Sequence, residues 1–218
     1  MQVDGELKQR LESWLCIPGS RNPEDSRFVQ DARRFCARIS AMVRRKVVPQ
    51  DTDVTSLELA CLALQLPVRN HSGFLARGAR SSLRDRAEQA AEMLVGLTNS
   101  GGRGGPERDV EETIQLLQQV YQRTPETDLA KLLADALNLE DFGVSGLVAL
   151  AVASGRNEGT VGQVAEGCVK REEYGYWEAR LKDGFHFEPV RQLARKRLEQ
   201  ARKMAALLVA ELKEDGAL

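Results

Sequence analysis

The chain has 218 residues, in which 31 Lys and Arg nearly balance 32 Asp and Glu to leave a net charge of −1. This length is enough for one sizeable hydrophobic core, and the balanced charge gives no overall field that would attract nucleic acid or an anionic membrane. The longest apolar runs, 57–66 and 144–153, are about half the roughly 20 residues of a membrane-spanning helix. Because residues 1–15 are charged where a signal peptide is apolar, we expect a cytoplasmic protein with no membrane partner.

Apolar side chains recur at helical spacing along most of the chain, which predicts an all-α fold. We expect a single-domain helical bundle of about 7–9 helices, with residues 1–22 as an N-terminal helical extension and residues 23–218 as the main domain. Asn22-Pro23 is typical of a helix start, and the helix after it presents an apolar face over 28–47. Residues 57–66 are apolar almost all round, so we place them in the centre of the bundle.

The second half of the chain follows a Gly-rich segment at 99–107, which we expect to be a flexible loop. Before this loop, Ser81 or Ser82 is expected to cap a helix that continues to Leu94. After it, the spacing predicts five further helices, at 110–120, 129–136, 147–153, 160–181 and 190–212. We expect the short third one to be buried and the long last one to pack onto the domain along a single apolar stripe.

The chain has four cysteines without a Cys-x-x-Cys pair, namely Cys16, Cys36, Cys61 and Cys168. We expect free thiols in the core, with an exposed reactive Cys16 or Cys168 as the alternative. Only two histidines are present, and no local spacing supports a closed zinc site. His186 lies between two phenylalanines, which predicts a half-buried histidine packed against the last helix.

Asp135 stands inside an otherwise apolar helical run at 132–139. A carboxylate in such a place needs a metal, a cation or hydrogen bonds, because burying an unpaired charge is costly. Asp135, Asn138 and Asp141 recur at intervals of three residues. One interpretation is therefore structural: these side chains cap a helix junction, and Gly143 permits the tight turn after it.

The second interpretation comes from a resemblance. The pattern Asp135-Ala136-Leu137, followed by an acidic residue and by Gly143 and Gly146, resembles the segment that carries the last metal ligand of HD-domain phosphohydrolases. The segment 57–66 lies where that family has an apolar helix ending in its His-Asp pair. The order of segments is similar to that of the bacterial single-domain members from about residue 23 to the C-terminus. The resemblance implies a helical bundle and, in active members, a divalent-metal site that hydrolyses phosphoesters.

The chain departs from this family at the metal site. The family holds its metal through a His on the first core helix, the His-Asp pair and the later Asp. Here the His-Asp position aligns with Leu64-Gln65, and residues 28–38 contain no His, so Asp135 alone remains. We therefore expect a degenerate member without a cofactor. The alternative is a rearranged site in which Asp135 and His71 hold Mn²⁺ or Mg²⁺.

An arginine cluster near the positions of the missing ligands indicates a possible anion-binding site, because residues 69–86 contain five Arg and no Lys. Guanidinium groups bind phosphate in a bidentate manner and stay charged when partly buried. The candidate ligand-binding residues for a phosphorylated small molecule are Arg77, Arg80, Arg84, Gln65 and Asp135. The alternative is a solvated helix face on which these arginines pair with neighbouring carboxylates.

Three functions remain open from the sequence. The first is a non-enzymatic binding or regulatory module, with a phosphorylated small molecule as the candidate ligand. The second is a metal-dependent phosphohydrolase that acts on a nucleotide or another phosphoester through a rearranged site. The third is an interaction module for a protein partner, a second copy of the chain or nucleic acid, the last disfavoured by the lack of net positive charge.

Overall fold

The computed structural model describes residues 3–16, 26–67, 82–99, 108–156 and 158–217. Within these ranges all regular secondary structure is helical and there is no strand, which confirms the predicted all-α bundle. The described part has ten α-helices and one short 3-10 helix, slightly more than expected. The chain divides into two compact units, Met1–Ala134 and Asp135–Leu218.

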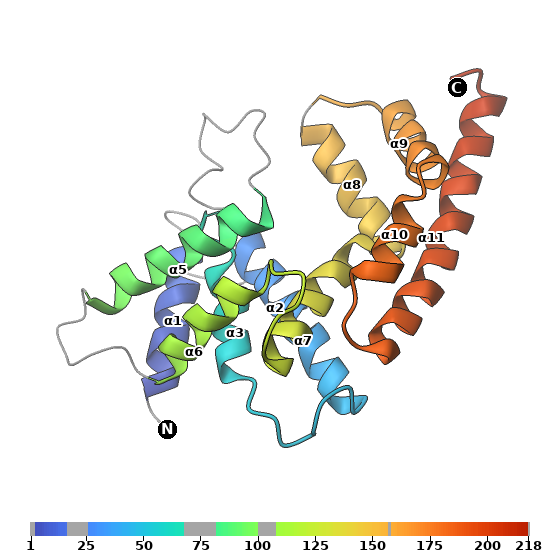
Figure 1. Ribbon diagram of the computed structural model, residues 1–218. Coiled ribbons are helices and arrows are strands. Elements are labelled where there is room, and N and C mark those ends of the chain that lie inside the picture. The colour runs from blue at the N-terminus through green and yellow to red at the C-terminus, as the bar shows by residue number, and fades with distance from the viewer. Residues whose placement is uncertain (1–2, 17–25, 68–81, 100–107, 157, 218) are drawn as a thin grey trace. The chain divides into compact units, whose positions relative to one another are not determined.

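The first unit is built around α3 (Figure 1). Helix α3 packs against α1, α2, α5 and α6, and seven of its nine residues are buried. Asp53 accepts a hydrogen bond from the Thr55 backbone N–H (2.9 Å) and so fixes the start of this helix. The unit contains α1 (Val3–Leu15), α2 (Arg27–Arg44), α3 (Thr55–Ala63), α5 (Leu83–Asn99), α6 (Arg108–Gln119) and the first part of α7 (Asp128–Asn138). The central position predicted for 57–66 is confirmed.

The start of α2 and the position of α1 can be compared with the predictions from the sequence. Helix α2 begins at Arg27, after Ser26, rather than directly after Asn22-Pro23, which lies outside the described residues. Ser26 is fully buried and its hydroxyl donates to the Leu15 carbonyl at the end of α1. Leu11 and Leu15 of α1 are also fully buried, so the predicted N-terminal extension contributes to the core of this unit. The Gly-rich segment 99–107 lies almost wholly outside the described residues.

Helix α5 begins where the sequence predicted. The Ser82 hydroxyl accepts from the Asp85 backbone N–H (3.1 Å), and the Asp85 carboxylate accepts from the Ser82 backbone N–H (3.0 Å). This reciprocal pair satisfies two donors at the helix start that would otherwise lack partners. It also keeps the Asp85 carboxyl ionised, since these hydrogen bonds lower its pKa.

The second unit joins the end of α7 to four helices that pack around an aromatic centre. Phe142 is completely buried and stacks edge-to-face on Trp177 and Phe185, with both pairs of ring centroids 5.2 Å apart. Helix α11 packs against α8, α9 and α10, and α8 also packs against α9. The elements are the 3-10 helix η2 (Leu139–Asp141), α8 (Val144–Arg156), α9 (Val161–Glu173), α10 (Tyr176–Asp183) and α11 (Glu188–Glu214).

Two predictions for this unit were wrong. The single helix expected over 160–181 is divided into α9 and α10 at Gly175, whose φ of +62° lies in the left-handed region that favours glycine. Helix α8, expected to be buried, exposes Val144, Val148 and Val152 by 40%, 50% and 47%. Its apolar composition does not bury it, because it packs on one side only, against α9, α11 and η2.

The turn after η2 depends on two glycines. Gly143 has a φ of +93°, as the sequence interpretation of a tight turn required. A Cβ at Gly146 would lie 2.4 Å from the Asp141 carbonyl oxygen, so no larger residue fits there without backbone movement. The two glycines therefore have a structural reason that is independent of any metal site.

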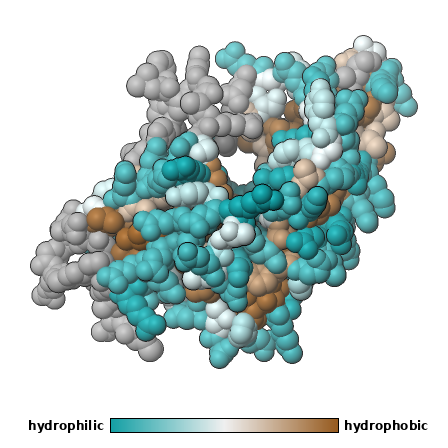
Figure 2. Space-filling model, viewed as in Figure 1, coloured by the Kyte–Doolittle hydropathy of each residue, from teal (hydrophilic) through white to brown (hydrophobic). Residues whose placement is uncertain are grey.

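The described residues on the face seen in Figure 2 are largely hydrophilic. Figure 2 shows teal residues over most of the visible face, interrupted by brown patches where apolar side chains reach solvent. Within the described ranges no single helix is long and apolar enough to cross a membrane, although the bent pair α7 and α8 meets that criterion together.

Candidate functional site

Asp135 is completely buried near the end of α7, and each of its carboxylate oxygens accepts a hydrogen bond. One accepts from the His186 backbone N–H (2.8 Å) and the other from the Phe187 backbone N–H (3.0 Å). Phe187 is the residue that precedes α11. The carboxylate therefore fixes the start of α11 to the end of α7, which favours the structural interpretation of this residue.

Burial raises the pKa of Asp135 to about 6, whereas the two backbone N–H groups and the nearby Arg191 act in the opposite direction. The sequence required hydrogen bonds, a cation or a metal for this carboxylate, and the structure supplies the hydrogen bonds. Arg191 itself donates to the Phe185 carbonyl and to the Glu188 carboxylate. His186, beside this site, is half-buried as predicted.

Asn138 and Asp141 are joined by an arginine that the sequence did not indicate. The Arg180 guanidinium donates to Asn138 Oδ1 and to Asp141 Oδ2, both at 2.9 Å. The Tyr176 hydroxyl also donates to Asp141 Oδ2 (3.4 Å). The interval of three residues correctly grouped the two acceptors, but Arg180 comes from α10, about 40 residues later, where no local pattern marks it.

The predicted arginine cluster is described only in part. Arg77, Arg80 and His71 lie outside the described residues. Arg84 is exposed and its Nε donates to Glu88 (2.8 Å), while its guanidinium carbon lies 5.7 Å from the centre of the Tyr121 ring. This is the solvated, carboxylate-paired arrangement that we gave as the alternative to a phosphate site.

A hollow of about 450 Å³ adjoins Arg84 on the surface of α5 and α6. Its wall includes Glu88, Glu92 and Tyr121. Two carboxylates in one wall repel an anion, so this hollow does not suit a phosphate group. Gln65, the other candidate from the first unit, is buried directly after α3 beside Leu64, whereas Asp135 belongs to the second unit.

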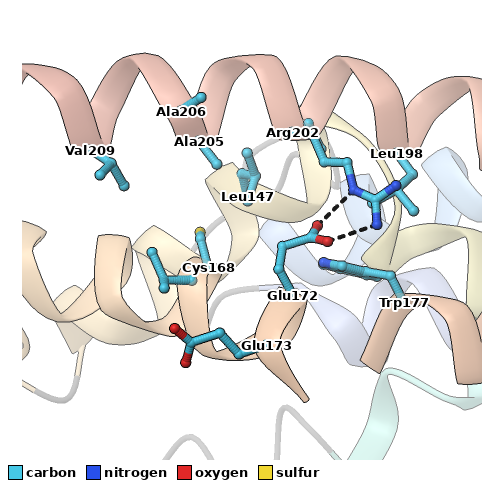
Figure 3. Close-up of a pocket in the computed structure, with 12 residues that line it drawn as sticks. Leu147, Cys168, Glu172, Glu173, Trp177, Leu198, Arg202, Ala205, Ala206 and Val209 are labelled. Carbon is cyan, nitrogen blue, oxygen red and sulfur yellow. Dashed lines mark hydrogen bonds and ion pairs between the residues drawn. The ribbon is translucent and has the colours of Figure 1, made fainter. Parts of the chain in front are cut away.

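The second unit contains another candidate site, which we call the apolar groove (Figure 3). It encloses about 380 Å³ between α8, α9, α10 and α11, and its wall is mainly apolar. The residues that line it are Leu147, Cys168, Val169, Glu172, Glu173, Trp177, Leu198, Ala201, Arg202, Ala205, Ala206 and Val209. Its size and composition are those of a small-molecule pocket.

A network of ion pairs borders the apolar groove. Arg202 donates to both oxygens of Glu172, at 2.8 and 2.7 Å, and also to Glu178 at 2.5 Å. Figure 3 shows the Glu172 and Arg202 side chains meeting between α9 and α11, beside Trp177. These bonds raise the pKa of Arg202 and lower the pKa of Glu178, so both of these groups stay charged at neutral pH.

Cys168 contributes an uncharged sulfur to the same wall. It is buried, and this burial raises the pKa of its thiol above the ordinary value. It is therefore not the exposed, reactive cysteine considered as an alternative. All four cysteines are free thiols, two of them buried (Cys61 and Cys168) and two half-buried (Cys16 and Cys36).

The sequence did not predict the apolar groove, because its residues come from four helices whose packing no local pattern reveals. The only signal was the α11 stripe, which continues past the buried Ala201 to Ala205 and Val209. The described ranges contain no group of three or more His, Cys, Asp and Glu side chains placed to hold a metal ion.

No protein-family model matches this chain, and no curated protein shows significant sequence similarity to it. Among solved structures, the chain is similar to YpgQ from Bacillus subtilis, solved in its selenomethionine form. The TM-score is 0.58 over 97% of each chain, at 16% sequence identity. This likeness supports the helical fold.

Proposed function

We propose that the chain is a non-enzymatic binding module, a degenerate relative of the HD-domain phosphohydrolases, that holds a small apolar molecule in the apolar groove. The observation that carries this proposal is the groove itself, a cavity of about 380 Å³ with a mainly apolar wall and a few charged groups at its border. Small-molecule sites typically occupy about 300–1,000 Å³ and combine such a wall with a few polar groups.

The positions that the HD family uses for metal support a role without catalysis. The His-Asp position aligns with Leu64 and Gln65, both of which are buried. The carboxylate of the retained Asp135 accepts hydrogen bonds from two backbone N–H groups. These two hydrogen bonds stabilise the buried carboxylate without the need for a metal ion. The buried acidic residue is thereby accounted for by the start of α11.

The charge of the apolar groove defines the class of ligand. The lining residues include two carboxylates, Glu172 and Glu173, and one guanidinium, Arg202, which is already shared between Glu172 and Glu178. An anionic ligand would compete with these carboxylates for the single cation. The groove therefore favours a neutral or cationic apolar molecule over an anionic one.

The test is fluorescence energy transfer from Trp177 to the neutral apolar dye N-phenyl-1-naphthylamine. A Trp14→Phe background leaves Trp177, in the groove wall, as the one donor, because the chain has two tryptophans. We expect saturable transfer, and weaker transfer to the anionic dye 1-anilinonaphthalene-8-sulfonate. Ala205→Phe, which fills the groove, should weaken binding of the neutral dye by at least about tenfold.

Ala210→Phe is the matched control, because Ala210 is exposed on the same helix and does not line the groove. Circular dichroism of each variant establishes that the helices are intact. Equal dye binding by the Ala205→Phe and Ala210→Phe variants would contradict the proposal. Tighter binding of the anionic dye would contradict the assigned ligand class.

The phosphorylated ligand predicted from the sequence depends chiefly on Arg77 and Arg80, which lie outside the described residues, so it stays a prediction. The metal-dependent phosphohydrolase has no observation that favours it. Elemental analysis of the purified protein, with a phosphoester assay in added Mn²⁺, addresses both. If the protein contains stoichiometric metal and has activity that Asp135→Ala abolishes, the proposal of a binding module would be wrong and the protein would be an enzyme.

A further inference from the structure

Two cysteines of the first unit lie against each other across a helix pair. Cys36 is on α2 and Cys61 is on α3, two helices that pack together in the core of this unit. The two thiols are close enough for each to shift the pKa of the other. The Cys36 sulfur also contacts the Glu58 carbonyl oxygen at 4.0 Å, and Glu58 is one turn before Cys61. The two thiols are thus neighbours in space despite 25 residues of separation.

The two thiols differ in access and acidity. Cys61 is 1% exposed, whereas Cys36 is half-buried and so reachable from solvent. The neighbouring Cys61 thiol lowers the pKa of Cys36, and Lys8 of α1 acts in the same direction, against burial and the Glu58 carboxylate. The neighbouring Cys36 thiol, together with burial, raises the pKa of Cys61. Cys36 is therefore the more nucleophilic sulfur, and Cys61 is a neighbouring thiol that can react with it in a second step.

The other two cysteines lie in different surroundings. The Cys16 thiol donates to the Glu12 carbonyl (3.2 Å), within its own helical turn. Cys168 belongs to the second unit, where burial raises its pKa. They serve as internal references for the reactivity of Cys36.

We propose that Cys36 and Cys61 are a redox pair that forms an intramolecular disulfide between α2 and α3 when the protein meets a hydroperoxide. In the first step, the Cys36 thiolate attacks one peroxide oxygen, the O–O bond breaks, and hydroxide leaves and is protonated to water. Cys36 is then a sulfenic acid. In the second step, the Cys61 sulfur attacks Cys36, the S–O bond breaks and a second water leaves. Two thiols and one hydrogen peroxide thus give one disulfide and two waters.

The disulfide would join the central helix of the first unit to α2. Thiolate character and solvent access select the first sulfur to react, and the adjacent second thiol resolves the sulfenic acid before further oxidation. Reduction by a dithiol reverses the modification, since thiol–disulfide exchange regenerates both thiols. The pair is a modification site that is independent of the apolar groove.

The experiment treats the full-length protein with hydrogen peroxide, blocks the remaining thiols and digests it with trypsin without a reductant. Residues 35–38 and 47–69 form two tryptic peptides with one cysteine each. We expect these peptides joined, with a loss of about 2 Da, the mass of two hydrogen atoms. We also expect Cys36 to be lost at least about tenfold faster than Cys16.

The variants assign the order of events. In Cys61→Ala and Cys61→Ser the sulfenic acid on Cys36 has no resolving thiol, so dimedone should label Cys36 there and not in the parent protein. In Cys36→Ser, Cys61 should stay reduced. Cys16→Ser and Cys168→Ser are controls that should leave the joined peptides unchanged, and circular dichroism checks that every variant is folded.

Three outcomes would overturn the proposal. One is oxidation of Cys36 no faster than that of Cys16. Another is dimedone labelling of Cys36 in the parent protein without any joined peptide. The third is a peroxide-induced disulfide that survives the Cys61→Ala change through another partner.

Discussion

Helices α3 and α8 are both rich in apolar residues, yet α3 is buried in the first unit and α8 is partly exposed in the second. In the first unit, α3 is surrounded by α1, α2, α5 and α6, and its residues from Leu59 to Ala63 are all 2% exposed or less. In the second unit, α8 packs on one side only and leaves Val148 half exposed. The number of packing neighbours, rather than the apolarity of the helix itself, decides how much of it is buried.

This difference separates the roles of the two units. A closely packed centre offers little internal space and gives stability, because each buried apolar group is removed from water and contacts others. The second unit has an apolar groove and an exposed valine face on α8, so part of its apolar surface is free for other contacts. We therefore expect the replacement of an apolar side chain by a smaller one to destabilise the first unit more than the second.

The largest expected effect is from truncation of a core leucine. Leu57→Ala in α3, where the side chain is fully buried, should lower the free energy of unfolding by about 3–4 kcal/mol. Leu147→Ala, at the half-buried wall of the apolar groove, should lower it by about 1 kcal/mol. Urea denaturation followed by circular dichroism measures both. Equal losses would break the comparison between the units.

The position of α3 could be predicted from the sequence because the segment is apolar all round, a pattern that only a central helix satisfies. The exposure of α8 could not be predicted, since it depends on which other helices reach it. The same limit explains why Asp135 was correctly assigned a need for partners while those partners were not identified. They are backbone N–H groups of His186 and Phe187, more than 50 residues later. Because every residue except proline has a backbone N–H group, the residue types do not indicate which of these groups acts as a donor.

The break between α9 and α10 has a similar cause. Gly175 is one glycine inside an otherwise helical pattern, and such a glycine is compatible with both a continuous helix and a turn. In the structure Gly175 has a left-handed backbone, and Trp177, two residues later, stacks on Phe142. The apolar groove was missed for the same reason, because four helices contribute to it.

The second prediction concerns the buried carboxylate of the second unit. In the unfolded chain Asp135 titrates near 3.8, whereas burial raises its pKa to about 6 in the folded protein. The folded state therefore binds the proton more tightly, and its extra stability is present below about pH 4 and is lost as the pH rises through 6. The expected loss is roughly 2–3 kcal/mol, from a shift of about two units.

Asp135→Asn should flatten this slope between pH 4 and 6, because the amide does not titrate. Asp53→Asn is the control: Asp53 is exposed, and hydrogen bonds from Thr55 lower its pKa, so its contribution is lost only at more acidic pH. Urea midpoints across this pH range provide the measurement. A parent protein whose stability does not fall between pH 4 and 6 would show that Asp135 is better solvated than its burial implies.

The smallest expected effect is at the exposed face of α8, and it tests the comparison most directly. Val148→Thr replaces a methyl group by a hydroxyl on a side chain that is 50% exposed, so stability should change by no more than about 0.5 kcal/mol. Val29→Thr is the matched change at a fully buried position of α2, where the hydroxyl loses its water and the cost should be about 1–3 kcal/mol. If Val148→Thr costs as much as Val29→Thr, the valine face of α8 is covered in solution, and the second unit is as closely packed as the first.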